Sequence, residues 1–212
     1  MDRNAAEYID LTMLLNEDVP VYPNHPKPMI KQQAALQKDG WNEKECTFSS
    51  HHGTHIDFPS HMIDKGKTQN DYEIGKFIGD GKIFDVRNKK EICETLKDVR
   101  EGDIVLFCTG RSKFAGDFQK YCHEAPVMTE GFADELVNKK IKLVGIDTWS
   151  VDQGKPFFIH KKLLSNDILI VENLTNLEKL IGKTCKIYVN PLRLDGFDGS
   201  PCRVFAEITA NP

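Results

Sequence analysis

Four of the seven histidines of this chain fall within residues 51–61, and an aspartate lies among them. Neutral imidazole and carboxylate groups are the usual ligands of a borderline metal ion such as zinc. The segment reads His51-His52-Gly53-Thr54-His55-Ile56-Asp57-Phe58-Pro59-Ser60-His61. Residues of these types at this density indicate a metal site.

The backbone conformation of the segment decides whether its ligands can meet at one ion. A helix is disfavoured because Gly53 and Pro59 both weaken it, and because Asp57 would lie almost opposite His55. A straight strand would direct the ligands to one face but spread them over roughly 33 Å, at about 3.3 Å per residue. Each ligand of a metal site lies about 2 Å from the ion. Neither regular conformation therefore builds the site.

A short extended segment, broken at the glycine and turned at the proline, is the remaining conformation. It would gather the side chains of His51, His55 and Asp57 into one cavity and leave His61 at the rim. The alternative is a polar surface loop whose histidines have no function. Three histidines and an aspartate packed around Gly, Thr and Pro favour the metal site over that alternative.

The segment resembles the His-x-Gly-Thr-His-x-Asp-x-Pro-x-His signature of the cyclase-type metal-dependent hydrolases, which include bacterial kynurenine formamidase and isatin hydrolase. Every fixed position of the signature is met here. Residues 143–152 and 196–203 resemble two further blocks of the family, so the likeness spans nearly the whole chain. The resemblance implies a compact mixed β/β/α architecture.

His160 and Glu172 are the strongest further ligand candidates. Glu172 ends the apolar run Ile168–Val171, and a carboxylate at the end of a buried strand is costly unless it is paired or binds a cation. A salt bridge at the strand end is the alternative. In binuclear relatives, a histidine and a glutamate before an Asn-Leu pair complete the site, and Glu172-Asn173-Leu174 fits that pattern.

The resemblance also implies how the ligands divide between two ions. His51 and His55 would bind one ion, and His160 would bind the other. Asp57 and Glu172 would bridge the two. Some relatives work with a single metal, so one or two ions are both compatible with the sequence. Zn²⁺ is the expected ion and Mn²⁺ the alternative, because imidazole and carboxylate ligands suit both.

These residues predict a metal-dependent hydrolase that cleaves a C–N bond of a small amide with a metal-activated water. The substrate class is an aryl formamide such as N-formylkynurenine, or a cyclic amide. His61 is the candidate proton donor for the leaving nitrogen, a role that the matching histidine has in the family, and a further ligand is its alternative role. Thr54 is expected to support the site by hydrogen bonding. The alternative function is a non-catalytic, metal-stabilised protein that binds a small molecule.

Tyr22 and Phe58 are the candidate substrate contacts. Tyr22 lies in the proline-framed stretch Pro20-Val21-Tyr22-Pro23. A tyrosine packed at the edge of the core is the alternative, but family members have an aromatic residue at this place lining the pocket. Many relatives have a small residue where this chain has Phe58. These two positions leave the identity of the substrate open.

The bulk composition describes an ordinary soluble protein. The 212 residues, 40% hydrophobic and 28% charged, are most simply one domain spanning 1–212. The net charge of −4 argues against a nucleic-acid or anionic membrane partner. The N-terminus has no apolar signal region, so a cytoplasmic location with six reduced cysteines is expected. The family resemblance implies a homodimer or homotetramer.

Hydrophobic periodicity predicts strands alternating with short helices, hence an α/β domain with a mixed sheet, with α+β as the alternative. Strands are predicted at residues 7–15, 44–50, 82–87, 103–108, 141–147, 168–172, 185–189 and 203–208. Helices are predicted around Ile92–Val99, after an N-cap at Thr129, and at His160–Asn166.

Overall fold

A mixed β-sheet organises the protein, in a computed structural model that describes residues 6–22 and 25–209. Within those ranges the main sheet has eight strands, in the order β1 (Glu7–Asp10), β12 (Gly199–Ile208), β11 (Cys185–Pro191), β5 (Ile78–Asp85), β7 (Ile104–Cys108), β9 (Leu143–Ile146), β10 (Leu169–Glu172) and β4 (His55–Asp57). β4 also pairs with the first part of β12, so the sheet closes on itself.

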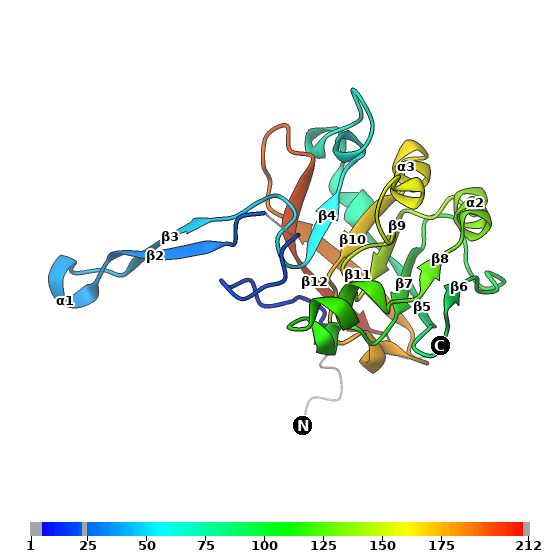
Figure 1. The fold of residues 1–212 in the computed structure, drawn as a ribbon, viewed down its shortest axis with the longest axis horizontal. Helices are drawn as coiled ribbons and strands as arrows, with labels where there is room; N and C mark the ends of the chain where they lie inside the picture. Colours follow the sequence, from blue (N-terminus) through cyan, green and yellow to red (C-terminus); the bar gives the residue numbers. More distant parts are fainter. Residues whose placement is uncertain (1–5, 23–24, 210–212) are drawn as a thin grey trace.

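Parallel and antiparallel pairs are combined in this sheet. β5, β7, β9 and β10 run parallel to their neighbours in that series, whereas β11, β12, β1 and β4 pair antiparallel. Helices α2 (Glu130–Asn138) and α3 (Phe158–Ser165) lie together beside the parallel part of the sheet (Figure 1). The predicted α/β class with a mixed sheet is confirmed.

Alternation along the strands creates two hydrophobic clusters. In β7, Ile104, Leu106 and Cys108 face the cluster enclosed by the sheet, while Val105 and Phe107 face the cluster beneath the helices. Successive side chains of a strand point to opposite faces, so a continuous apolar run serves both clusters. The helices contribute their own buried stripes to the second cluster, at Phe132, Ala133 and Leu136 in α2 and at Ile159, Leu163 and Leu164 in α3.

A two-stranded arm projects from the body of the molecule (Figure 1). It consists of β2 (Met29–Ala34), the short helix α1 (Leu36–Asp39) and β3 (Glu43–Thr47). Of the strand residues only Ala34 is buried, and Trp41 near the tip is 58% exposed. β3 agrees with the predicted strand near residues 44–50. β2 was not predicted, because apolar and polar residues do not alternate along it.

Some predicted elements differ from the structure. The predicted helix near Ile92–Val99 is wrong: residues 91–92 form strand β6, which pairs with β8 (Val127–Met128), and turns follow. Ile92, Leu96 and Val99 are nevertheless buried. They pack in the same hydrophobic cluster although the chain between them is not helical. The first strand ends at Asp10 rather than near residue 15, and α3 begins two residues earlier than predicted.

The remaining elements are single turns of helix. They are 3₁₀ turns at Pro59–His61, Gln69–Asp71, Ile74–Phe77, Ser112–Phe114 and Leu177–Leu180, and a π-helical turn at Gln119–His123. Among the residues that the structure describes, no helix has the length and apolarity needed to cross a membrane.

A glycine in the sheet, Gly145, and a glycine in a helix, Gly131, differ in the space around them. A methyl group at Gly145 in β9 would lie 2.7 Å from Leu174 Cδ1 and also collide with Leu106, whereas one at Gly131 in α2 would meet nothing within 4 Å. We expect Gly145→Ala to destabilise the protein by about 1–3 kcal/mol, as overpacking does. Gly131→Ala should stabilise it by up to about 1 kcal/mol, because alanine favours a helix. Urea unfolding of both variants measures this, and equal stabilities would contradict the packing described.

Candidate metal centre

Strand β4 presents two candidate ligands on one face. Its side chains alternate, so His55 and Asp57 point together while Ile56 points into the enclosed core. Before the strand, Gly53 has a φ of +64°, a left-handed conformation that glycine adopts without strain. This bend returns His51 toward the strand, so that its Nδ1 lies 2.8 Å from Asp57 Oδ1. The segment thus has the bent, extended conformation expected from its sequence.

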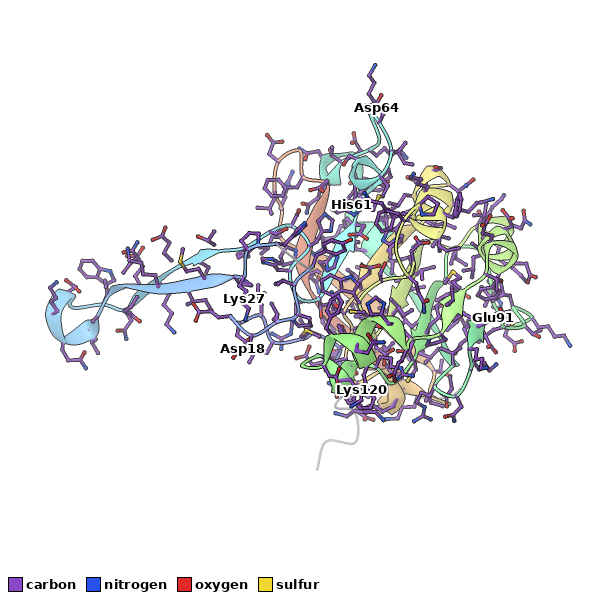
Figure 2. The ribbon with its side chains drawn as sticks, viewed as in Figure 1. Asp18, Lys27, His61, Asp64, Glu91 and Lys120 are labelled. Carbon is purple, nitrogen blue, oxygen red and sulfur yellow. The ribbon has the colours of Figure 1, made fainter. Side chains whose placement is uncertain are left out.

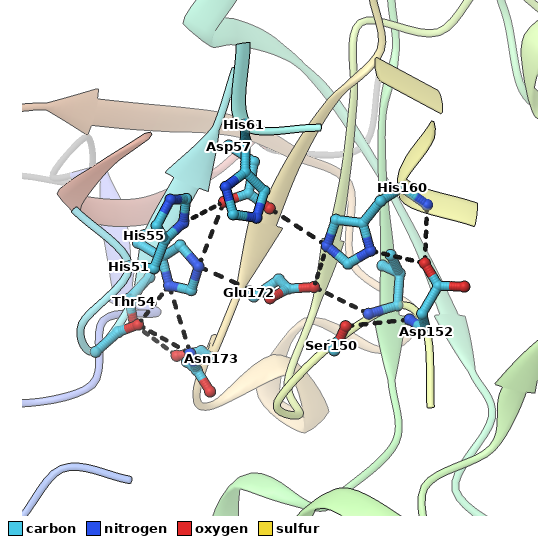
Figure 3. Close-up of polar contacts among 12 residues, drawn as sticks. His51, Thr54, His55, Asp57, His61, Ser150, Asp152, His160, Glu172 and Asn173 are labelled. Carbon is cyan, nitrogen blue, oxygen red and sulfur yellow. Dashed lines mark hydrogen bonds and ion pairs between the residues drawn. The ribbon is translucent and has the colours of Figure 1, made fainter. Parts of the chain in front are cut away.

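Strand β10 and helix α3 add two further candidate ligands. β10 pairs antiparallel with β4, which places Glu172 directly opposite His55. His160 projects from the first turn of α3 toward them (Figure 3). Asp152 orients this histidine, because its Oδ2 accepts hydrogen bonds from His160 N at 2.9 Å and from His160 Nδ1 at 2.7 Å.

The five side chains meet in a compact, buried cluster (Figure 3). His55 Nε2 lies 3.4 Å from Asp57 Oδ1 and 3.7 Å from Glu172 Oε2. On the other side, His160 Nε2 lies 3.2 Å from Glu172 Oε1 and 3.6 Å from Asp57 Oδ2. The two carboxylates therefore stand between the imidazoles, as bridging ligands would. Candidate ligand atoms of His55, Asp57 and Glu172 all lie within 4.8 Å of one another.

Two features of this cluster fit a cation. Asp57 Oδ2 is buried and, among the described residues, has no hydrogen-bond partner. His55 Nδ1 donates to the carbonyl oxygen of Gly53 at 2.9 Å, so its Nε2 presents a lone pair to the two carboxylates. Buried acceptors facing one another are costly unless a cation or a proton lies between them. The residues present therefore fit a divalent metal ion.

The carboxylates control the charge of the site. Burial disfavours protonated His51, but hydrogen bonds to Asp198 and Asp57 outweigh it and raise the pKa of His51 to about 10. Burial opposes charge on His160 too, yet Glu172 and Asp152 hold its pKa well above the usual value. For His55, burial dominates and lowers the pKa. Because metal ligands must be deprotonated, a metal ion that bound His51 and His160 would displace their protons.

Comparisons with known proteins agree with this geometry. The sequence model of the Cyclase family matches residues 9–153. An uncharacterized protein of Methanocaldococcus jannaschii is 35% identical over a 205-residue alignment, which covers 94% of this chain and 98% of the relative. The chain belongs to the cyclase family. The kynurenine formamidase of Bacillus cytotoxicus is 29% identical over 204 residues, 94% of this chain and 96% of the relative.

Solved structures share the cyclase-family fold. A Bacillus stearothermophilus protein, described as a predicted metal-dependent hydrolase, superposes with a TM-score of 0.80 at 29% identity, over 96% of this chain and 99% of that one. Isatin hydrolase A of Labrenzia aggregata superposes with a TM-score of 0.85 at 23% identity, over 97% and 94% of the chains. At that lower identity the likeness shows the fold alone.

His61 lies at the edge of the cluster, as the last residue of the turn Pro59–His61. Its side chain is 25% exposed, against 4% for His55 and 1% for Asp57. Its ring centroid lies 4.0 Å from that of His51 and 6.1 Å from that of His160. A nitrogen of His61 is also within 4.8 Å of ligand atoms of His51 and Asp57, so this position is compatible with both the donor and the ligand role.

The two candidate substrate contacts lie in different environments. Tyr22 is 45% exposed and stacks on Trp149, with ring centroids 6.2 Å apart. Trp149 belongs to the loop after β9, which also contains Asp152. Pro23 lies outside the described residues. Phe58 is fully buried, stacked on Tyr72 in the enclosed core. Its position does not agree with the predicted substrate contact, because it follows Asp57 and so points to the opposite face.

Four further residues form hydrogen bonds around the candidate ligands. Thr54 donates to the carbonyl oxygen of Asn173 at 2.6 Å, in agreement with the expected hydrogen-bonding role, and Asn173 donates in turn to Gly53 O. Asp152 and Asp198 were not predicted as site residues. Both lie in stretches that resemble family blocks, but spacing alone does not show that loops so distant in sequence reach the histidines.

The backbone of Gly199 lies close to the ring of His51, which predicts the effect of a substitution at Gly199. A methyl group at Gly199 would lie 2.5 Å from His51 Cε1. We expect Gly199→Ala to displace this ring and lower the metal content of the purified protein. Gly116→Ala is the control, since a methyl group there meets nothing within 4 Å. Elemental analysis measures both variants, and full metal content in Gly199→Ala would remove His51 from the ligand set.

Substitution of Glu172 tests its bridging position. Glu172→Gln keeps the side-chain shape, but a neutral amide compensates two cations poorly. We expect the metal-to-protein ratio to fall, with a second ion lost before the first. The exposed Glu178, six residues further on, provides Glu178→Gln as a charge-matched control. A Glu172→Gln protein with full metal content and full activity would make Glu172 a purely structural carboxylate.

Proposed function

We propose that this cyclase-family protein is a metal-dependent hydrolase that cleaves a C–N bond of a small amide. An aryl formamide such as N-formylkynurenine, or a cyclic amide, is the proposed substrate class. The observation that supports this most is the buried Asp57 Oδ2, an acceptor without a hydrogen-bond partner among the described residues, which lies 3.6 Å from His160 Nε2 while Oδ1 of the same carboxylate faces His51 and His55. Similarity to a kynurenine formamidase and to a metal-dependent hydrolase, each at 29% identity, supports the reaction class.

The residues that would hold the metal are His51, His55 and Asp57 on one side, with Glu172 and His160 on the other. A divalent ion bound there would polarise the substrate carbonyl and make a water acidic enough to attack near neutral pH. Zn²⁺ is the proposed ion and Mn²⁺ the alternative, since both accept this donor set. One or two ions are compatible with two carboxylates that each approach more than one imidazole.

The protein's own contribution to amide cleavage is a positioned proton. An amine leaves poorly unless its nitrogen is protonated, and a general acid supplies that proton. His61 is suited to this role because its side chain is 25% exposed, against 4% for His55 and 1% for Asp57, and its ring adjoins that of the partly exposed His51. The turn that begins at Pro59 holds it there, since His61 N donates to the carbonyl oxygen of Phe58 at 2.9 Å. Tyr22 and Trp149 would provide an aromatic wall for the substrate.

An activity screen of a metal-analysed sample tests the proposed function. Purified protein of known zinc and manganese content is assayed on aryl formamides, lactams and lactones. We expect turnover on at least one amide class, and its loss after chelation with recovery on adding metal back. Bound metal without turnover on the whole panel would favour instead a metal-stabilised binding protein.

The proton-donor role of His61 makes a separate prediction. His61→Ala should retain metal and fold while turnover of an amide falls by roughly 10²- to 10⁴-fold, the usual worth of general acid–base catalysis. An aryl ester, whose leaving group departs without protonation, should lose much less. Rates on a matched amide and ester, together with metal stoichiometry, measure this.

Ser60→Ala is the matched control for the same turn. Ser60 Oγ is buried and, among the residues that the structure describes, has no hydrogen-bond partner, so its removal breaks no hydrogen bond. If His61→Ala lost metal and damaged both substrates equally, His61 would be a ligand and not the acid.

A further inference from the structure

We propose that Asp198 is a positioning residue that orients both His51 and His61 through a single carboxylate oxygen. Its Oδ2 lies 2.9 Å from His51 Nε2 and 3.3 Å from His61 Nδ1. The inference rests on the proposed function, because it assigns Asp198 to the side chain that would deliver the proton.

Backbone contacts hold Asp198 in place. Its carbonyl oxygen accepts a hydrogen bond from Phe58 N at 2.9 Å, and the carbonyl oxygen of Phe58 accepts one from His61 N at 2.9 Å. Phe58, directly after β4, therefore anchors the backbone of both Asp198 and His61. The next residue, Gly199, pairs with Asp57 at the start of β12. The distance between Asp198 and His61 is thus set by strand pairing and by the turn, not by a flexible loop.

A carboxylate can only accept hydrogen bonds, and this determines which ring nitrogens bear hydrogen. His61 must donate from Nδ1, which leaves Nε2 as the nitrogen available to the substrate. His51 donates from Nε2 to Asp198, and its Nδ1, 2.8 Å from Asp57 Oδ1, faces the ligand cluster. Nδ1 is therefore the nitrogen that would lose its proton to bind a metal ion. Carboxylates that fix metal-bound histidines in this way set both the tautomer and the ring orientation. Asp198 would do so for a ligand and for the proton donor together.

The exposure of Asp198 limits the size of its effect. Its side chain is 42% exposed, so water can replace part of each hydrogen bond. We therefore expect a loss typical of residues that support metal ligands, about 10- to 100-fold in metal affinity or activity. A simple surface ion pair with His51 would contribute little and would not depend on His61.

A double-mutant cycle tests the coupling between Asp198 and His61. Asp198→Ala, His61→Ala and the double variant are saturated with Zn²⁺ and assayed on the matched amide and ester. Asp198→Ala alone should lower amide turnover by about 10- to 100-fold, and the ester less. In the His61→Ala background it should cost little more, because residues that act through one another are not additive. An equal loss in both backgrounds would overturn the proposal.

A readout independent of catalysis separates this inference from the proposed function. In Zn²⁺-loaded protein, ¹⁵N–¹H correlation spectra should show His61 protonated at Nδ1, with assignment from the His61→Ala spectrum. Asp198→Ala should remove this tautomer preference and weaken Zn²⁺ binding in competition with a chromophoric chelator. An unchanged His61 tautomer would overturn the positioning role whatever the enzyme's activity. If the tautomer changed but His61→Ala kept full amide turnover, the proposed acid would fail and Asp198 would still orient His61.

Two variants control for structure. Asp198→Asn retains an accepting oxygen of the same shape, so its tautomer and turnover should lie closer to the parent protein than to Asp198→Ala. Asp195→Ala removes an exposed carboxylate from the same loop, where Asp195 accepts from Asn70 Nδ2 at 2.7 Å. It should leave turnover and the His61 tautomer unchanged. If Asp195→Ala reproduced the effects of Asp198→Ala, the loop as a whole, and not the Asp198 carboxylate, would be responsible.

Discussion

Burial of two carboxylates among three imidazoles is the constraint on which this structure depends. Asp57 and Glu172 are almost fully enclosed, where an uncompensated charge is far more costly than in water. Neighbouring His160 and His51 outweigh the effect of burial and hold the pKa of Asp57 well below its usual range. Such a cluster resists collapse into an apolar core and keeps its polar atoms directed at one point, which suits a cation.

The sheet supplies the rigidity that this cluster needs. β4 is short, but it pairs with β10 on one side and with β12 on the other, so its side chains are held from both edges. Alternate residues from His55 onward then point to opposite faces of the sheet. Ile56 and the following Phe58 pack into the enclosed core, while His55 and Asp57 point to the other face, where Asp57 approaches His160. Packing and chemistry are thereby built from the same strand without competing for a face.

Two loops contribute carboxylates that bind the histidines of the site. Asp152, before α3, and Asp198, before β12, each bind a histidine nitrogen of the site. Asp152 accepts from backbone as well as from the ring of His160, so it is itself fixed by the helix start. Asp198 instead spans His51 and His61, which lie on either side of β4. One carboxylate in this way connects the candidate ligand cluster with the proposed proton donor.

Part of the candidate site was predictable from sequence because three of its candidate ligands are close together along the chain. His51, His55 and Asp57 lie within seven residues of one another, so the bend at a glycine and the alternation of a strand suffice to predict that they meet. The strands β7, β9 and β10 were equally predictable, since continuous apolar runs indicate burial on both faces. A local sequence pattern predicts structure well where neighbouring residues determine the conformation.

Only the tertiary structure decided the rest. The helical spacing of Ile92, Leu96 and Val99 belongs to a strand and turns, because contacts with distant elements override local propensity. Phe58 lies in the core because the pairing of β4 determines which of its faces is enclosed. Asp198 reaches His51 across 147 positions of sequence, through the pairing of β12 with β4. No local sequence pattern predicts the contact between Asp198 and His51, because it forms only when β12 pairs with β4.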